Sequence, residues 1–363
     1  MIIRQATKSD LSQLLTVEES CFTEDRLTRR SFKHFLSSVT AWVQVVEEHD
    51  QIQGYSITLF RKGTCLSRLY SLAVLPQYRG KKLAEQLIAR SEQYAIDQGC
   101  IFLRLEVRTD NQAAITLYQR LNFRTFGHIS HYYADGCDAI RMEKTLIRHV
   151  IKTPKALPYY KQSTEFTCGP SALMIAMKSL EPATTMDMLE ELQIWREATT
   201  VFMLAGHGGC SPFGLALSAW KRGFKVQLYA SSDEVPFIDS VRDKEKKGIV
   251  SQIHHDFVRQ IEQTDIEVNY QTLTADKLLE HIQDGMVAIT LISTWQFNRH
   301  KIPHWIAVTH ADEKYVYLSD PEPDEEMMHT GTDNIAVPVR GSDFSQIACY
   351  GKKRQKYTLL ISL

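Results

Sequence analysis

Residues 163–177, STEFTCGPSALMIAM, place a cysteine at the start of a helical pattern. Cys168 follows a polar lead-in and precedes Gly169-Pro170, and apolar residues at helical spacing begin directly afterwards. Proline fits the first helical turn because its missing N–H needs no partner there. A helix N-terminus carries about half a positive charge, which favours a thiolate over a thiol. The stretch predicts a helix with a reactive thiol at its start; a small buried cysteine is the alternative.

Three further residues fit the chemistry of a reactive thiol. Gln162, six positions upstream, can donate an amide N–H to an oxyanion beside the backbone N–H of Cys168. Downstream, residues 303–320, PHWIAVTHADEKYVYLSD, predict a strand, a turn and a second strand. If the hairpin turns around Asp312, His304 lies directly opposite Asp320, close enough for a carboxylate to orient an imidazole. A shift of one residue would put the two side chains on opposite faces.

A cysteine, a histidine, an orienting carboxylate and an upstream glutamine form the constellation of papain-like catalysis. The second half resembles the papain-like peptidases that remove double-glycine leaders from bacteriocins, through KQSTEFTCGPSALMIA, HWIAVTH, YLSDP and, more loosely, SPFGLALSAWKRGFKVQLY. The resemblance spans roughly residues 158–325. It implies that Cys168 attacks a peptide carbonyl while His304 moves the proton. It also implies that Asp320 fixes the imidazole and that Gln162 helps to stabilise the oxyanion.

The first half has a different pattern, because strands and helices alternate over residues 1–146, which predicts an α/β domain. Apolar residues at 83, 84, 87, 88 and 95 recur at helical spacing, and Gly99 supplies the end of that helix. The loop before it lies within LPQYRGKKLAEQLI, residues 75–88. Backbone N–H groups at a helix N-terminus, with Arg79, Lys81 and Lys82 beside them, form a natural seat for a pyrophosphate. By itself, a basic loop of this kind is more often only a loop.

The next strand–helix unit is LEVRTDNQAAITLYQRLNF, residues 105–123, which places Glu106 on a strand face and Tyr118 on a helix. Together with the basic loop, it resembles the GNAT acyl-CoA N-acetyltransferases. Within them it is most similar to the ribosomal-protein-alanine N-acetyltransferases, which acetylate protein N-terminal amines. The resemblance covers essentially all of residues 1–146 and implies the GNAT fold, a mixed central sheet with flanking helices. Without it, Glu106 would be interpreted as a solvated carboxylate and Tyr118 as a core aromatic residue.

The resemblance implies that acetyl-CoA is the cofactor and that the loop backbone binds its pyrophosphate. Lys82 stands where the second glycine of the family's R-x-x-G-x-G/A loop is usual, a substitution that fits if its φ is negative. By the same resemblance, Glu106 accepts a proton from the incoming ammonium and Tyr118 protonates the departing CoA thiolate. The residues assigned to the cofactor are Leu72, Val74, Arg79, Gly80, Lys81, Lys82, Leu83, Ala84 and Asn111.

The length of 363 residues exceeds what one hydrophobic core usually serves, so two domains are expected. We place a linker at 147–157, where two prolines interrupt the pattern, and an α+β domain at 158–363, because its helices come first and its strands follow. Seven scattered cysteines without a CxxC pair favour reduced thiols in the cytoplasm over disulfides or a structural metal. A net charge of −1 and the lack of a long apolar run give no reason to expect nucleic acid or membrane partners.

Two other histidine-bearing stretches carry no predicted site. His207 and Cys210, in GHGGCSP, lack a second half-site for a metal. His254-His255 falls in a charged stretch, which predicts an exposed helix, and adjacent residues of a helix do not share a face.

The two halves together predict a two-site cytoplasmic enzyme. An acetyl-CoA-dependent N-acetyltransferase that acts on peptide or protein amines is fused to a papain-like cysteine peptidase. Two alternatives remain open. In one, the second half is a catalytically silent peptide-binding module; in the other, the chain is a small-molecule amine acetyltransferase and amidase.

Overall fold

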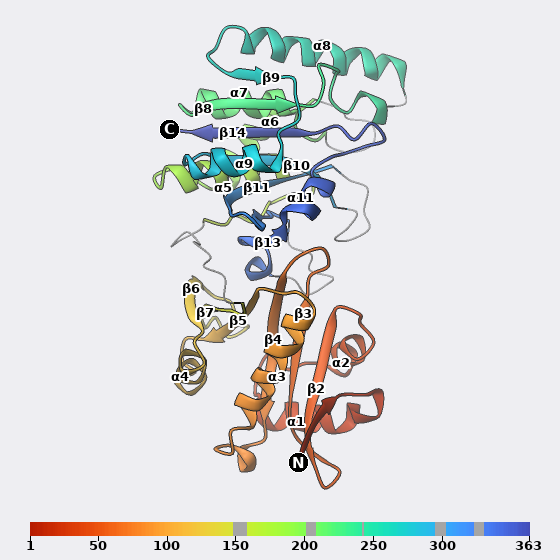
Figure 1. The fold of residues 1–363 in the computed structure, drawn as a ribbon, viewed down its shortest axis with the longest axis vertical. Coiled ribbons are helices and arrows are strands. Elements are labelled where there is room, and N and C mark those ends of the chain that lie inside the picture. The colour runs from red at the N-terminus through yellow and green to blue at the C-terminus, as the bar shows by residue number, and fades with distance from the viewer. Residues whose placement is uncertain (148–157, 201–207, 242, 295–302, 323–329) are drawn as a thin grey trace. The chain divides into compact units, whose positions relative to one another are not determined.

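Figure 1 shows the computed structural model of the chain, in which the described residues are 1–147, 158–200, 208–241, 243–294, 303–322 and 330–363. The chain divides into two compact units, Met1–Ile151 and Lys152–Leu363. Each unit has its own seven-stranded sheet. The linker predicted at 147–157 lies, apart from residue 147, outside the described residues, as does His207.

The sheet of the first unit has the strand order β1-β2-β3-β4-β5-β7-β6. Its strands are β1 Ile2–Gln5, β2 Ala41–Glu48, β3 Gln51–Phe60, β4 Leu66–Val74, β5 Phe102–Arg108, β6 Arg124–Ile129 and β7 Ala139–Thr145. Only β4 and β5 run parallel among the neighbouring pairs of this sheet in the described residues, so the sheet is mixed. The helices are α1 Leu11–Cys21, α2 Arg29–Phe35, α3 Leu83–Asp97 and α4 Gln112–Arg120.

Helix α3 follows the predicted periodicity. Leu83, Leu87, Ile88 and Ala95 are all buried on one side of the helix, which therefore packs its apolar stripe against the sheet. Gly99 has φ of +79°, a left-handed conformation that suits a glycine just after a helix. The helix predicted over residues 83–98 is thus confirmed.

The sheet of the second unit has the order β13-β12-β11-β10-β14-β8-β9. Its strands are β8 Lys225–Ala230, β9 Glu267–Asn269, β10 Val287–Ser293, β11 Pro303–Ala311, β12 Tyr315–Ser319, β13 Val337–Arg340 and β14 Tyr357–Ser362. The helices are α5 Cys168–Leu180, α6 Met188–Ala198, α7 Pro212–Lys221, α8 Lys244–Ile261, α9 Ala275–Gln283 and α11 Gly341–Ile347. The strand, turn and strand predicted over residues 303–320 are β11 and β12, and the α+β class is confirmed.

Helix α5 is the central helix of the second unit. Every residue from Cys168 to Met177 is buried, because the helix is apolar around its whole circumference and shares one core with strands β10, β11 and β14. A helix enclosed in this way cannot shift without opening the core. Its first residue, Cys168, is therefore held in a fixed place.

The prediction that His254 lies on an exposed helix is wrong. On α8, Val250, His254, Phe257 and Ile261 follow one another at intervals of four, three and four residues, so the histidine belongs to the apolar stripe. Its ring meets that of Phe213 edge-on, with the centroids 4.7 Å apart. Burial lowers the pKa of His254 to about 4, so the ring is neutral at physiological pH.

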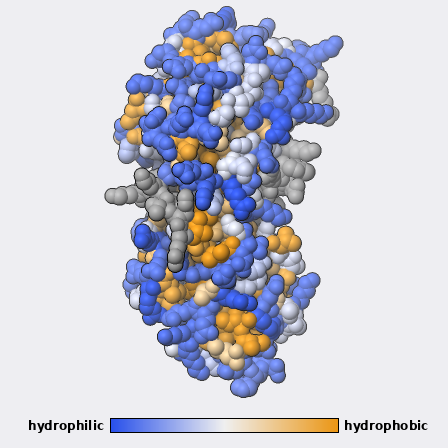
Figure 2. All heavy atoms as spheres, viewed as in Figure 1, coloured by the Kyte–Doolittle hydropathy of each residue, from blue (hydrophilic) through white to orange (hydrophobic). Residues whose placement is uncertain are grey.

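The face of the surface seen in Figure 2 is mostly hydrophilic. Figure 2 shows hydrophilic side chains over most of one face, interrupted by separate hydrophobic areas. Large exposed hydrophobic residues such as Val39 and Leu189 are far apart in the sequence and lie in different units. Among the helices of the described residues, none is both long enough and apolar enough to cross a membrane.

Candidate active sites

A cleft opens in the first unit where β4 and β5 separate. The two parallel strands pair only at residues 66–68 with residues 102–104, although β4 continues to Val74 and β5 to Arg108. The cavity has a volume of about 1420 Å³ and is lined by the parts of both strands beyond this pairing. A ligand in the cleft can therefore reach backbone groups that have no strand neighbour on this side.

Most of the predicted cofactor residues line this cleft. They are Leu72, Val74, Arg79, Gly80, Lys82, Leu83, Ala84 and Asn111. Lys81 is not among the lining residues, although its Nζ lies over the ring of Tyr78, 5.2 Å from the centroid, and Tyr78 does line the cleft. The structure thus brings together the residues before and after Lys81 in the cleft wall.

The loop that precedes α3 has left-handed backbone at two positions. Gly80 has φ of +81°, and a Cβ placed there would meet nothing within 4 Å. Lys82, the N-cap of α3, has φ of +59° and ψ of +23°, so the condition of a negative φ at this residue is not met. Left-handed backbone costs a residue with a Cβ about 1–2 kcal/mol. The loop keeps the shape that a glycine would adopt at residue 82, and it carries a cation there.

Glu106 lies on β5 and forms a buried ion pair. Its Oε2 is 2.9 Å from Nε of Arg68 on β4, and the two side chains are 5% and 2% exposed. A buried carboxylate is stable as an anion when a cation is paired with it. Glu106 also lines the cleft, so one wall of the cavity presents a carboxylate that Arg68 holds in place.

Tyr118 lies on α4, and its position depends on the start of that helix. Asn111 caps α4 by accepting a hydrogen bond at Oδ1 from the backbone N–H of Ala114, at 3.1 Å. Tyr118 is buried and lines the cleft, and burial raises its pKa to about 12. Its hydroxyl is therefore protonated at neutral pH and can act as a proton donor.

The sequence analysis missed several side chains of the cleft. Glu18, Arg68, Tyr70 and Tyr133 all line it. Burial raises the pKa of the Tyr133 hydroxyl, and the charge of Glu106 adds to this effect. The adjacent aromatic residues at 132 and 133, within SHYYADGCDA between two strands, were the one signal that could have drawn attention to that loop.

In the second unit, Cys168 is the first residue of α5, as predicted. Thr167 is the N-cap, and its Oγ1 donates a hydrogen bond to the carbonyl of Thr164 at 3.1 Å, which fixes the approach to the helix. Cys168 is 9% exposed. The thiol thus lies at the positive end of a helix that the core holds rigidly.

His304 lies between Asp320 and Cys168. Its Nε2 donates to Oδ1 of Asp320 at 2.7 Å, and its side chain also hydrogen bonds with Cys168. Burial opposes protonation of the imidazole, but Asp320 and Cys168 outweigh it and raise the pKa of His304. A further carboxylate, Glu322, has Oε2 3.5 Å from Nδ1 of His304.

The predicted strand register is wrong by two residues. Ala307 pairs with Ser319 and Val308 with Leu318, and a bulge follows between Val308 and His310. Continued in the same register, His304 would face residue 322 rather than Asp320. Because a shift of two residues preserves the face, Asp320 still reaches the imidazole from just beyond the end of β12.

Gln162 is held close to the same residues. Its backbone N–H donates to the carbonyl of Pro321 at 2.9 Å, next to Asp320. Its side-chain Nε2 donates to the carbonyl of Thr164 at 3.0 Å, which uses one of the two N–H groups of the amide. The segment that leads to Cys168 is therefore attached to the segment that carries Asp320.

Comparison with known proteins gives a separate family match for each of the two halves of the chain. Residues 157–362 match the model of the Peptidase_C39 like family, and residues 9–123 match that of the Acetyltransferase (GNAT) family. An N-alpha-acetyltransferase of Sulfolobus acidocaldarius is 31% identical over 163 residues, which cover 40% of this chain and 92% of that protein. The putative [ribosomal protein bS18]-alanine N-acetyltransferase of Bacillus subtilis is 29% identical over 147 residues, covering 40% of this chain and 95% of that protein.

Further matches come from two shorter alignments and from a solved structure. Two further relatives, N-alpha-acetyltransferases, are matched over only 38% and 52% of their own lengths. Among solved structures, the ribosomal-protein-S18-alanine N-acetyltransferase of Escherichia coli has a TM-score of 0.38 and 23% identity, covering 42% of this chain and 98% of that chain. On the family matches, the chain belongs to the GNAT acetyltransferase family through its first unit and to the Peptidase_C39 like family through its second.

Proposed function

We propose that the first unit is an acetyl-CoA-dependent N-acetyltransferase that acts on the amines of peptides or proteins. The observation that carries this proposal is the cleft between β4 and β5, which is lined both by the loop before α3 and by Glu106 and Tyr118. The relatives named as N-alpha-acetyltransferases, or as acting on ribosomal-protein alanine, support an N-terminal amine as the acceptor.

The residues present fit acetyl-CoA, which GNAT acetyltransferases use. The N-terminus of α3 offers unpaired backbone N–H groups, and Arg79 and Lys82 add positive charge near them. A cavity of about 1420 Å³ is large enough for a long cofactor together with an acceptor. When bound, the cofactor supplies an acetyl group activated as a thioester.

Two residues of the chain then carry out the two proton transfers of the reaction. Glu106, held in place by its ion pair with Arg68, attracts the acceptor ammonium and takes its proton, directly or through water. Tyr118, protonated at neutral pH, donates to the leaving sulfur. This division matches the needs of the reaction, because an amine attacks only when deprotonated and a thiolate leaves more easily once protonated.

Mass spectrometry of a peptide pool incubated with acetyl-CoA tests this function. We expect a mass increase of one acetyl group on peptide N-termini, and no increase with Glu106→Gln. Small amines offered in parallel address the alternative that the acceptor is a small molecule. Acetylation of small amines alone would contradict the peptide assignment.

A specific geometry favours a second activity, cysteine peptidase, in the second unit. Cys168, His304 and Asp320 form a buried chain of hydrogen bonds, and Gln162 is attached beside them. In this proposal the Cys168 thiolate attacks a peptide carbonyl and His304 transfers a proton to the leaving amine. The backbone N–H of Cys168 and the second N–H of the Gln162 amide stabilise the oxyanion.

The same peptide pool without acetyl-CoA tests this second activity. New termini in the wild-type digest that are absent with Cys168→Ala are the expected result. Labelling of Cys168 by a thiol-reactive probe at the rate found in a denatured control would instead support the alternative of a silent peptide-binding module. If the cleaved peptides also carry the acetyl groups, the two sites share one substrate and the chain is bifunctional.

A further inference from the structure

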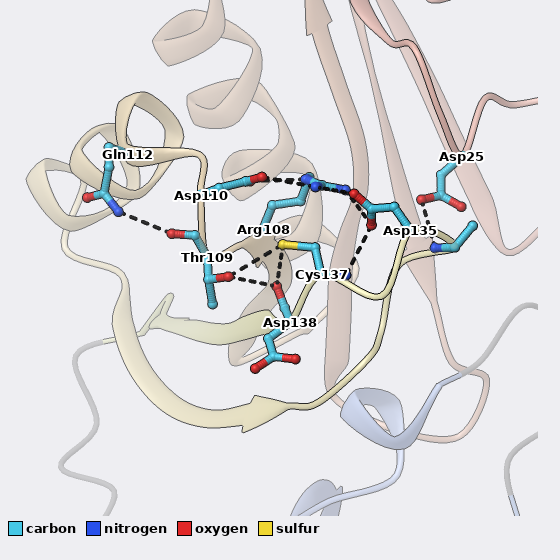
Figure 3. Close-up of polar contacts among 9 residues, drawn as sticks. Asp25, Arg108, Thr109, Asp110, Gln112, Asp135, Cys137 and Asp138 are labelled. Carbon is cyan, nitrogen blue, oxygen red and sulfur yellow. Dashed lines mark hydrogen bonds and ion pairs between the residues drawn. The ribbon is translucent and has the colours of Figure 1, made fainter.

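Arg108, the last residue of β5, connects two loops at the cleft (Figure 3). Its Nε and Nη2 donate to the two carboxylate oxygens of Asp110 at 3.0 and 2.9 Å. Its Nη1 and Nη2 donate to the two oxygens of Asp135 at 3.1 and 2.6 Å. One guanidinium thus binds two carboxylates, each through both oxygens, and its plane also lies over the ring of Tyr133, 4.8 Å from the centroid.

The two carboxylates belong to different parts of the cleft. Asp110 immediately precedes Asn111, the cap of α4, so it lies on the side that carries Tyr118. Asp135 belongs to the loop of residues 130–138 between β6 and β7, which we call the acceptor loop. Both carboxylates, with Arg108 itself, line the cleft.

The acceptor loop is a tight turn with a defined shape. Gly136 has φ of +83°, and its N–H donates to the carbonyl of Tyr133 at 2.8 Å. Asp138 accepts at Oδ1 from the N–H of His131 at 2.8 Å, and the N–H of Ala134 donates to Asp25, before α2, at 3.3 Å. The contacts of the loop with β5 and with Asp25 are visible in Figure 3. Internal bonds fix the shape of the loop. Its position is set by bonds to other segments: the backbone N–H of Thr109 donates to the carbonyl of Asp138 at 3.1 Å, Asp25 accepts from Ala134, and Arg108 ties Asp135 to Asp110 at the start of α4.

We propose that Arg108 is the positioning residue that holds the acceptor loop, with Tyr132 and Tyr133, against the acceptor end of the cleft. The inference rests on the proposed acetyl transfer, and it assigns Arg108 to the binding of the acceptor peptide rather than of acetyl-CoA. The acceptor loop carries Tyr133 close to Glu106, whose charge acts on the Tyr133 hydroxyl. If the Arg108 bonds are lost, the aromatic wall beside the proposed base moves, while the loop before α3 keeps its own contacts.

Steady-state kinetics of the full chain with Arg108→Gln tests this inference. We expect KM for an acceptor peptide to rise roughly tenfold, since small displacements of positioning groups reduce productive binding, and KM for acetyl-CoA to change less than twofold. Asp135→Asn should act in the same direction. The double variant with Arg108→Gln and Asp135→Asn should have the same peptide KM as Arg108→Gln alone, because both changes remove the one interaction that the two residues share.

The matched control is Arg4→Gln. Arg4 also binds a carboxylate through two nitrogens, because its Nη1 and Nη2 donate to the two oxygens of Asp10, each at 2.8 Å. The side chain of Arg4 is 33% exposed, and that of Arg108 is 28% exposed. Arg4 does not line the cleft within the described residues, so both KM values should stay at the wild-type level. An equal rise in peptide KM with Arg4→Gln, or an unchanged peptide KM with Arg108→Gln, would overturn the proposal.

Amide hydrogen exchange provides a second measurement, which does not depend on acetyl transfer. Residues 131–138 should exchange faster in Arg108→Gln than in the wild type or in Arg4→Gln, and unchanged exchange there would refute the positioning role. If the wild type acetylates nothing, the proposed function fails, and the exchange rates still decide whether Arg108 holds the loop.

Discussion

Nε2 of His304 lies 2.7 Å from Oδ1 of Asp320, and the two side chains are 4% and 9% exposed. With Nε2 occupied by the Asp320 carboxylate, Nδ1 is the imidazole nitrogen left for proton exchange with Cys168, and Oε2 of Glu322 lies 3.5 Å from it. The same contact raises the pKa of His304 and so stabilises the imidazolium. We therefore expect the reactivity of the Cys168 thiol to depend on Asp320, which lies 152 positions downstream in the printed sequence.

Asp320→Asn should lower the reactivity of Cys168 near neutral pH by about tenfold or more. Asp320 raises the pKa of His304, so its stabilising contribution is complete below pH 6.5 and is lost as the pH rises through the raised pKa. In Asp320→Asn the pKa of His304 is less raised, so the imidazole loses its proton at a lower pH than in the wild type. Alkylation by iodoacetamide, followed by mass spectrometry of the Cys168 peptide, measures the effect. Cys137, which belongs to the other unit, is the internal control; equal rates at Cys168 in both proteins would exclude Asp320 as the orienting residue.

Glu106→Gln should reduce acetyl transfer by about a hundredfold or more and leave KM for acetyl-CoA nearly unchanged, because the carboxylate acts on the acceptor. It should also lower the thermal midpoint, since it leaves Arg68 buried without its partner carboxylate, a change that typically costs about 3–5 kcal/mol. Turnover is therefore measured well below the midpoint found by calorimetry. Full turnover in the folded variant would remove Glu106 from the mechanism.

Two substitutions of Lys82 separate the effect of its left-handed backbone from the effect of its charge. Lys82→Gly should stabilise the first unit by about 1 kcal/mol, because glycine adopts φ of +59° without a Cβ conflict. It should also raise KM for acetyl-CoA, because it removes a cation from the cleft. Lys82→Ala is the control, since it loses the same charge but keeps the strain. If both variants have the same thermal midpoint, the left-handed backbone at residue 82 is not a source of strain.

The buried ring of His254 should make the second unit sensitive to acid. Its pKa is lowered to about 4, so the contribution of His254 to the free energy of unfolding should be constant above about pH 6.5 and fall as the pH drops from there toward 4. His254→Leu keeps the packing against Phe213 but removes the titrating group, which should flatten this dependence. Urea unfolding at a series of pH values measures it. The exposed neighbour provides the comparison, because His255→Leu should still show the loss in acid.

Local patterns were enough to find the elements that carry the candidate sites. The apolar spacing after residue 83 predicted α3, and the position of Cys168 before Gly169-Pro170 predicted the start of α5. Both depend on residues within one or two turns of a helix. The charged residues around His254 were misleading, because the position of a residue on a helix face depends on the apolar stripe and not on its immediate neighbours.

The sequence by itself determined which chemical groups the chain carries and which helix or strand holds each one: a thiol at a helix start, and a carboxylate and a phenol on a strand and the next helix. The tertiary structure alone decided which groups meet. The bulge in β11 and the pairs Arg68–Glu106 and Arg108–Asp135 arise from contacts between segments that no local pattern relates. Such contacts depend on strand register and loop closure, where one added residue changes every later partner.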